Sequence, residues 1–160
     1  MAYHDDLLIQ ALLLVRKEPK NPKQASLRRS VSTAYYGLFH FLINETLANW
    51  SKPNSRPRLV RAFDHRTMKA AANRVCNERE FPFAGENPQV VSNLRTVAKT
   101  FVRLQDKRHI ADYDNSTSWT RTQALREVNA AEQAFRMWKS IRNEQIAQNF
   151  LVSILVKHRD

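Results

Sequence analysis

Glycine, cysteine and proline are scarce in this chain, and each scarcity excludes a class of protein. The 160 residues include 2 glycines and 6 prolines, which leaves little material for the tight turns of an all-β fold. The single cysteine, Cys76, cannot form an intramolecular disulfide or a cysteine-rich metal site. Alanine, leucine, arginine, lysine, glutamine and glutamate abound, so we expect helix throughout.

Long apolar runs are also missing. The longest are Ala11–Val15 and the serine-interrupted Phe150–Val156, and both are far too short to span a bilayer. Residues 1–6 lack the basic segment that opens a signal peptide. These features predict a soluble, cytoplasmic protein with one domain over residues 1–160 and no membrane partner.

Acidic residues are few beside the basic ones. There are 15 aspartates and glutamates against 26 lysines and arginines, and the formal net charge is +11. Such an excess predicts a polyanionic partner, either RNA or a nucleotide. Residues 51–75 alone carry a net charge of +6, since Asp64 opposes seven cations: Lys52, Arg56, Arg58, Arg61, Arg66, Lys69 and Arg74. This segment is either a phosphate-binding surface or a solvated helix face that adds solubility.

Apolar residues recur at helical spacing in about five stretches, which predicts an all-α, up-and-down helical bundle. Two helix starts carry Asn-Pro signatures, at Asn21 and Asn87, and a third carries a Thr120/Gln123 capping box. Polar loops with prolines separate the helices, for example Glu80–Asn87. The expected helices are residues 7–15, 22–49, 58–76, 88–113 and 121–141.

A further apolar stripe lies at the end of the chain, in residues 143–158. It consists of Ile146, Phe150, Leu151, Ile154 and Leu155. Two interpretations stay open: the stripe packs on its own bundle, or it forms a dimer contact.

The richest polar segment is Arg103–Tyr113. Arg108 and Asp112 are four residues apart, as are His109 and Tyr113, so these four can share one helix surface. Asp112 could orient His109 or pair with Arg108. A histidine in this setting can transfer protons near neutral pH, and arginines can bind a phosphate. The structural alternative is that these residues only form an intrahelical ion pair.

Arg103 and His109 stand in a different relation. Six residues place them roughly 240° apart around a helix and about 9 Å apart along it. They could cooperate only through a distorted helix or across a dimer interface.

Candidate phosphate-binding residues lie on two other predicted helices. On the second helix, Arg29, Tyr36 and His40 line up away from the apolar stripe. On the third, Arg61 and His65 lie one turn apart on either side of Asp64, suited to an ion pair or a phosphate contact. Three further cations complete the set: Arg58, Arg66 and Lys69.

Histidine spacing and glycine content limit the chemistry. His40, His65 and His109 form no His-x-x-x-His pair, so we expect no metal site and no cofactor. The chain has no glycine-rich phosphate loop, which excludes nucleotide hydrolysis of the P-loop kind.

Three segments occur in the order typical of one family. They are Ser26–His40, with the pair Tyr35-Tyr36 and then Phe39-His40; Arg61–His65; and Arg108–Tyr113, which ends in Ala-Asp-Tyr. Over residues 25–114 the chain resembles the HEPN domain family. The resemblance implies a helical bundle that is usually a homodimer. In many members an arginine and a histidine separated by four to six residues cleave RNA without metal, in a cleft between two protomers.

Two arginines match patterns of that family. Arg103 and His109 have five residues between them, which makes them the phosphate-binding arginine and the acid/base histidine that the resemblance implies. Arg108 matches the arginine of related Arg-x-x-Ala-Asp-Tyr forms, so the functional arginine is either Arg103 or Arg108. Two functions follow as expectations: a metal-independent endoribonuclease of toxin type, or a non-catalytic module that binds RNA, a nucleotide, or a protein partner such as a small nucleotidyltransferase or an antitoxin.

Overall fold

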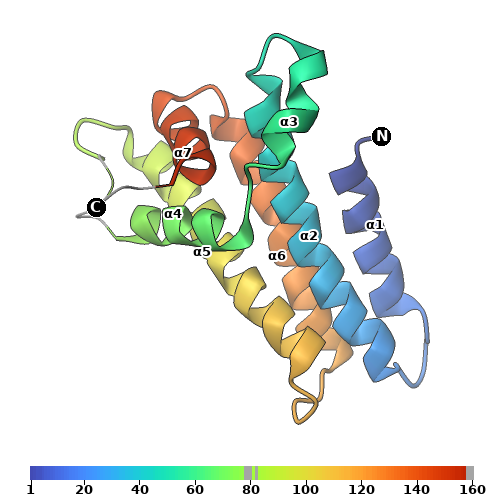
Figure 1. The fold of residues 1–160 in the computed structure, drawn as a ribbon. Coiled ribbons are helices and arrows are strands. Elements are labelled where there is room, and N and C mark those ends of the chain that lie inside the picture. Colours follow the sequence, from blue (N-terminus) through green and yellow to red (C-terminus); the bar gives the residue numbers. More distant parts are fainter. Residues whose placement is uncertain (78–80, 82, 158–160) are drawn as a thin grey trace. The chain divides into compact units, whose positions relative to one another are not determined.

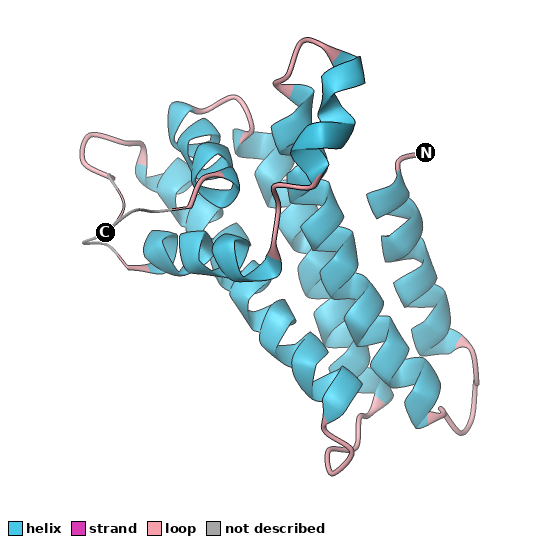
Figure 2. Cartoon of the chain, in the orientation of Figure 1, coloured by secondary structure: helices cyan, strands magenta, loops and turns pink. Residues whose placement is uncertain are grey.

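The computed structural model describes residues 1–77, 81 and 83–157, and the regular elements in that part of the chain are all helical. Figure 1 labels the α-helices in chain order, and Figure 2 shows helices joined by loops. The all-α prediction is therefore confirmed for the described residues. No helix in them is long and apolar enough to cross a membrane. The elements are α1 (Tyr3–Arg16), α2 (Gln24–Ala48), the 3-10 helix η1 (Pro53–Ser55), α3 (Arg56–Val60), α4 (His65–Cys76), α5 (Pro88–Tyr113), α6 (Arg121–Ile141) and α7 (Gln145–Leu155).

Two predicted helix starts are confirmed by their capping bonds. Pro88 is the first residue of α5, and the side-chain oxygen of Asn87 accepts the backbone N–H of Gln89 at 2.8 Å. Before α6, the N–H of Gln123 donates to the Thr120 hydroxyl at 3.1 Å, and the N–H of Thr120 donates to the side-chain oxygen of Gln123 at 2.9 Å. Each cap satisfies backbone donors that the first helical turn leaves unpaired, so local sequence determines where these helices begin.

The predicted start of the second helix is wrong. Regular α2 begins at Gln24, and Pro22 lies before it. The side-chain amide of Gln24 donates to the Trp119 carbonyl at 2.7 Å, and its oxygen accepts the Trp119 N–H at 2.8 Å. A contact 95 residues away in sequence thus accompanies this helix start, in place of the local Asn-Pro signal.

The predicted third helix is not continuous. It is interrupted at residues 61–64, which divides it into α3 and α4. With α7 formed by the terminal stripe, the described chain has seven α-helices instead of about five. Asp64 has an extended backbone, and its carboxylate accepts the Thr67 N–H at 2.8 Å and the Thr67 hydroxyl at 2.7 Å. Those bonds make Asp64 the N-cap of α4 and lower the pKa of its carboxyl group. Within a continuous helix Asp64 could not make these two capping bonds, so they favour a break at this position.

The terminal apolar stripe packs within its own chain, the first of the two predicted arrangements. Helix α7 lies against α4. Ile146, Phe150, Leu151 and Ile154 are buried, and the Phe150 ring centroid lies 6.0 Å from that of Trp138. The predicted range ran on to residue 158, which lies outside the described residues, as do Glu80 and Pro82 of the predicted loop.

The chain forms two compact units. Unit 1 comprises residues 1–41 and 103–135, and unit 2 comprises residues 42–102 and the chain from residue 136 onward. The single domain over residues 1–160 stays a prediction.

Unit 1 contains α1, residues 24–41 of α2, residues 103–113 of α5, and residues 121–135 of α6. Helices α1 and α2 are antiparallel, because the ring of Tyr3 at the start of α1 lies 4.9 Å from that of His40 late in α2. Helices α2 and α5 are antiparallel as well, since Arg28 early in α2 hydrogen-bonds to Ala111 late in α5. The helices of this unit therefore alternate in direction (Figure 1).

Aromatic side chains form one end of the core of unit 1. The rings of Phe41 and Phe135 are stacked, with centroids 4.2 Å apart and planes 12° from parallel. His4 is buried against both in edge-on contacts, at 5.1 Å and 5.7 Å. These contacts join α1, α2 and α6.

Unit 2 contains α3, α4, α7 and the remaining parts of α2, α5 and α6. Its centre is the fully buried Trp138, whose indole N–H donates to the Glu45 carboxylate at 2.7 Å. The other oxygen of Glu45 accepts Arg142 at 2.9 Å. One carboxylate thus links the end of α2 to the end of α6 and to the residue after it.

Candidate functional site

The polar segment Arg103–Tyr113 forms the last three turns of α5, and it lies wholly in unit 1. Helical geometry distributes its side chains over different faces. Arg108 turns toward α2, Arg103 toward α6, and His109 and Tyr113 toward solvent. Each direction has its own contacts and its own chemistry.

Arg108 is enclosed by aromatic rings. Its guanidinium carbon lies 5.2 Å from the ring centroid of Tyr35 and 5.8 Å from that of Tyr36, and the side chain is 13% exposed. Burial raises the pKa of the Tyr35 hydroxyl well above its usual range, an effect that nearby Arg108 partly opposes. Tyr35 therefore stays neutral, and the arginine stacks on a neutral ring, which suits a structural cation–π contact.

Asp112 pairs with Arg108. One carboxylate oxygen lies 3.9 Å from the guanidinium and also accepts the hydroxyl of Ser32 at 3.3 Å. Of the two predicted partners of Asp112, the described residues therefore show the arginine and no bond to His109. The ion pair and the ring contacts join α5 to α2.

His109 and Tyr113 form a separate, exposed pair. Their ring centroids are 5.0 Å apart, and Tyr113 is 67% exposed. Within the described part of the chain, the His109 side chain makes no hydrogen bond or ion pair. Its ring nitrogens are therefore open to solvent and to a ligand.

Arg103 contacts α6. Its Nη2 lies 2.7 Å from Oε1 of Glu127; the arginine side chain is 44% exposed and the glutamate side chain 4%. The second oxygen of Glu127 is buried and accepts no hydrogen bond from the described residues. Glu127 fixes one edge of the guanidinium and leaves the rest facing outward.

The turn after α5 is held by a residue that the sequence analysis did not single out. Arg28 donates to the carbonyls of Ala111 at 3.0 Å and Asp114 at 2.8 Å, and also to that of Thr117. Hydrogen bonds from the Ser116 hydroxyl, the Thr117 hydroxyl and the Ser116 N–H lower the pKa of Asp114 to about 2. This network fixes the C-terminal end of α5 and with it the position of His109.

The unit 1 candidates for phosphate binding differ in exposure. Arg29 is exposed on α2, whereas Tyr36 and His40 are half-buried. The His40 ring packs at 4.9 Å from Tyr3 and at 5.3 Å from Phe39. Arg29 is therefore the most accessible of the three.

The remaining phosphate-binding candidates lie in unit 2. Arg58, Arg61 and Arg66 are exposed, and His65 and Lys69 are half-buried. The predicted one-turn relation between Arg61 and His65 is wrong, because Arg61 is the C-cap of α3 while His65 is the first residue of α4. Asp64, expected between them as an ion-pair partner, instead uses its carboxylate to cap α4.

Glu127 is the second residue of the candidate site that the sequence did not single out. It lies three residues after Ala124 and four before Ala131, and both alanines are fully buried. That spacing places Glu127 on the inner face of α6, so a charged residue within a buried stripe was the available signal. The described residues contain no cluster of three or more histidines, cysteines or acidic residues that could hold a metal ion.

Comparison of the chain with protein-family models, with curated proteins and with solved structures finds no match.

Proposed function

We propose that this protein is a HEPN-like, metal-independent endoribonuclease that acts as a homodimer. The observation that carries the proposal is the contrast in exposure along the end of α5. The His109 side chain is exposed and makes no hydrogen bond or ion pair among the described residues, while Arg103 presents a half-exposed guanidinium that Glu127 orients. Arg108 is 13% exposed and stacked on two tyrosines, so Arg103 is the better candidate for a phosphate contact.

The chemistry follows from these two side chains. His109 takes the proton of a ribose 2′-hydroxyl, and that oxygen attacks the adjacent phosphorus. The bond from phosphorus to the 5′ oxygen breaks, and the departing oxygen receives a proton from water, while His109 releases the proton it took to solvent. The products are a 2′,3′-cyclic phosphate and a free 5′-hydroxyl. Arg103 stabilises the negative charge that builds on the phosphate oxygens.

The proposal needs two copies of the chain. Helix α5 is continuous from Pro88 to Tyr113, so Arg103 and His109 remain roughly 240° apart around it, which is about 120° by the shorter way, and about 9 Å apart along it. One phosphate cannot readily meet both side chains of one protomer. A two-fold axis beside α5 would set His109 of one protomer against Arg103 of the other.

Cleavage of structured RNA in the presence of EDTA tests the proposal. Wild-type protein should produce cyclic-phosphate ends, and His109→Ala should lose the activity while keeping the wild-type melting temperature. Arg126→Ala is a suitable control, because it removes one exposed charge from α6 and leaves His109, Arg103 and Glu127 in place. Absence of cleavage by the wild type, or equal cleavage by His109→Ala, would overturn the nuclease.

Mixing two inactive variants tests the shared site. His109→Ala carries an intact Arg103, and an Arg103→Ala variant carries an intact His109. If one site uses residues from two protomers, mixed dimers should regain part of the activity. Mixtures that form mixed dimers yet stay inactive would contradict the shared arrangement.

A second candidate function is a non-catalytic module that binds RNA or a nucleotide, alone or beside a nucleotidyltransferase or antitoxin partner. It is favoured by the Arg103–Glu127 ion pair, because an arginine bonded within its own chain can serve the fold alone. It is also favoured by the exposed cations Arg58, Arg61 and Arg66 of unit 2. RNA binding that persists without cleavage would support it.

A further inference from the structure

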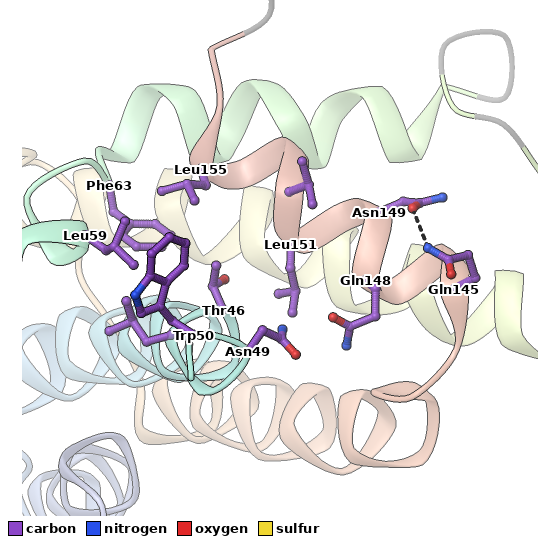
Figure 3. A pocket seen from close by; sticks show the side chains of 12 residues that line it. Thr46, Asn49, Trp50, Leu59, Phe63, Gln145, Gln148, Asn149, Leu151 and Leu155 are labelled. Atoms are coloured by element: carbon purple, nitrogen blue, oxygen red, sulfur yellow. Dashed lines mark hydrogen bonds between the residues drawn. The ribbon is translucent and has the colours of Figure 1, made fainter. Parts of the chain in front are cut away.

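An apolar pocket lies in unit 2 beside the basic segment 51–75. Its volume is about 260 Å³, and it is lined by the end of α2, by α3 with the residues after it, and by α7 (Figure 3). The walls include Leu47, Leu59, Phe63, Leu151 and Leu155. The volume is slightly below the roughly 300–1,000 Å³ of pockets that hold drug-sized ligands, so it suits one planar ring system.

Trp50 lines the same pocket, and its side chain is exposed while its backbone is held by hydrogen bonds. It is 48% exposed, yet its backbone N–H donates to the carbonyl of Leu47 at 3.0 Å. Its own carbonyl accepts two hydrogen bonds from the guanidinium of Arg56, at 3.2 Å and 3.0 Å. A large aromatic side chain on an anchored backbone offers a stacking surface with little entropy to lose on binding.

Amide side chains line the other end of the pocket, opposite Trp50 (Figure 3). The amide N–H of Gln148 donates to the carbonyl of Arg142 at 2.6 Å, which leaves its side-chain oxygen to accept a hydrogen bond. Gln145 and Asn149 bond to each other, since the amide N–H of Gln145 donates to the side-chain oxygen of Asn149 at 2.9 Å. A hydrogen-bond acceptor at one edge of an apolar pocket can meet the amino group of a nucleobase such as adenine.

The chain segment that supplies the Leu59 and Phe63 walls of the pocket is rich in positive charge. Residues 51–75 carry a net charge of +6. Arg58 and Arg61 are exposed and lie within two residues of the pocket residues Leu59 and Phe63. Cations next to an aromatic pocket are the combination with which proteins hold single-stranded nucleic acid, since the cations follow the backbone and the ring takes a base.

From this combination we infer that the pocket binds one nucleobase of single-stranded RNA, stacked on Trp50, with neighbouring phosphates on Arg58 and Arg61. The inference extends the proposed action on RNA, but this binding uses no residue of α5. An apolar side chain from a protein partner would fill the same volume without using the arginines or the amide edge. Binding at this pocket and cleavage at His109 are therefore separable.

Binding of a short single-stranded oligoadenylate to the His109→Ala protein tests the inference, because any cleavage would be removed. Trp50 is the exposed tryptophan, whereas Trp119 and Trp138 are 6% and 0% exposed, so stacking should quench the exposed fraction of the fluorescence. Trp50→Ala should weaken binding roughly 5- to 150-fold, the usual range for one base stacked on an aromatic side chain. Trp50→Phe should retain most of the affinity.

Leu13→Ala is the matched control, since it removes a 65% exposed apolar side chain from α1, outside the pocket. Equal affinity of Trp50→Ala and Leu13→Ala would overturn the inference. So would a change from dimer to monomer on Trp50→Ala with RNA affinity unchanged, because a second copy would then occupy the pocket. If Trp50→Ala does not fold, the double variant Arg58→Glu with Arg61→Glu should bind the oligoadenylate more weakly than Leu13→Ala does. Equal affinity of the double variant and Leu13→Ala would also overturn the inference.

Discussion

Replacing Arg103 by alanine should destabilise the protein, because it leaves the Glu127 carboxylate buried without its partner. The two groups meet at 2.7 Å, with the glutamate side chain 4% exposed and the arginine side chain 44% exposed. Breaking a fully buried pair costs about 3–5 kcal/mol, whereas exposed pairs contribute about 0.2–1 kcal/mol. With one partner buried and the other screened by solvent, we expect a loss of about 2 kcal/mol.

Thermal unfolding followed by circular dichroism measures this loss. For a chain of this size, about 2 kcal/mol corresponds to a fall of about 4–8 °C in melting temperature. Arg126→Ala removes the same charge from an exposed position on α6, and its effect should stay within about 0.5 kcal/mol. The difference between the two variants isolates the cost of the unpaired carboxylate from the change in net charge.

A second substitution tests whether the unpaired Glu127 carboxylate causes the loss of stability. In the Arg103→Ala background, Glu127→Gln removes the buried charge at nearly constant volume, so the double variant should be more stable than Arg103→Ala alone. If it is equally or less stable, the unpaired carboxylate is not the cause of the loss.

The same double variant separates two roles of Arg103. If the arginine contacts the phosphate, Arg103→Ala with Glu127→Gln regains stability but not RNA cleavage. If the arginine serves only to neutralise Glu127, cleavage returns together with stability. The first outcome is the one that the proposed mechanism requires.

Three further predictions concern the fold. Gly37→Ala should stabilise the protein by about 0.5–1 kcal/mol in denaturant titrations, because alanine is the better helix former. A Cβ at this position has room, since its nearest atom is the His4 carbonyl oxygen at 3.7 Å. A loss of stability would mean that α1 and α2 are too close for the added methyl group. Asp64→Ala should lower the free energy of unfolding by about 1 kcal/mol through loss of the α4 N-cap, whereas Asp64→Asn should retain most of the stability that the cap provides. The pKa of Asp114 is lowered to about 2 by its hydrogen bonds, so its contribution to stability is complete above about pH 4 and is lost as the pH falls toward 2. Asp114→Asn should therefore flatten the fall in melting temperature across that interval, and an unchanged slope would contradict this.

Local sequence was sufficient for much of the fold. The caps at Asn87 and at Thr120 with Gln123 act within three residues of the helix start, so their donors and acceptors are adjacent in any conformation that begins a helix. Spacing also predicted the contact between His109 and Tyr113, because residues four apart share a helix face. The expectation that Arg108 and Asp112 share this surface was wrong, since those two contact α2. The Asp64 cap was equally local, but the apolar pattern around it predicted one continuous helix.

Pairings between helices required the tertiary structure. The choice of Asp112 between two neighbours on its own helix depended on α2, which brings Tyr35 to Arg108 and Ser32 to Asp112 from about 70–80 positions earlier in the chain. The partner of Arg103 was likewise not local, since Glu127 lies 24 residues away on α6. Sequence by itself determined that this protein is helical, basic and equipped with an arginine- and histidine-rich segment, because periodicity, charge and composition need no knowledge of packing. Only packing decided which arginine is enclosed and which faces outward, because burial depends on the helices that cover a face.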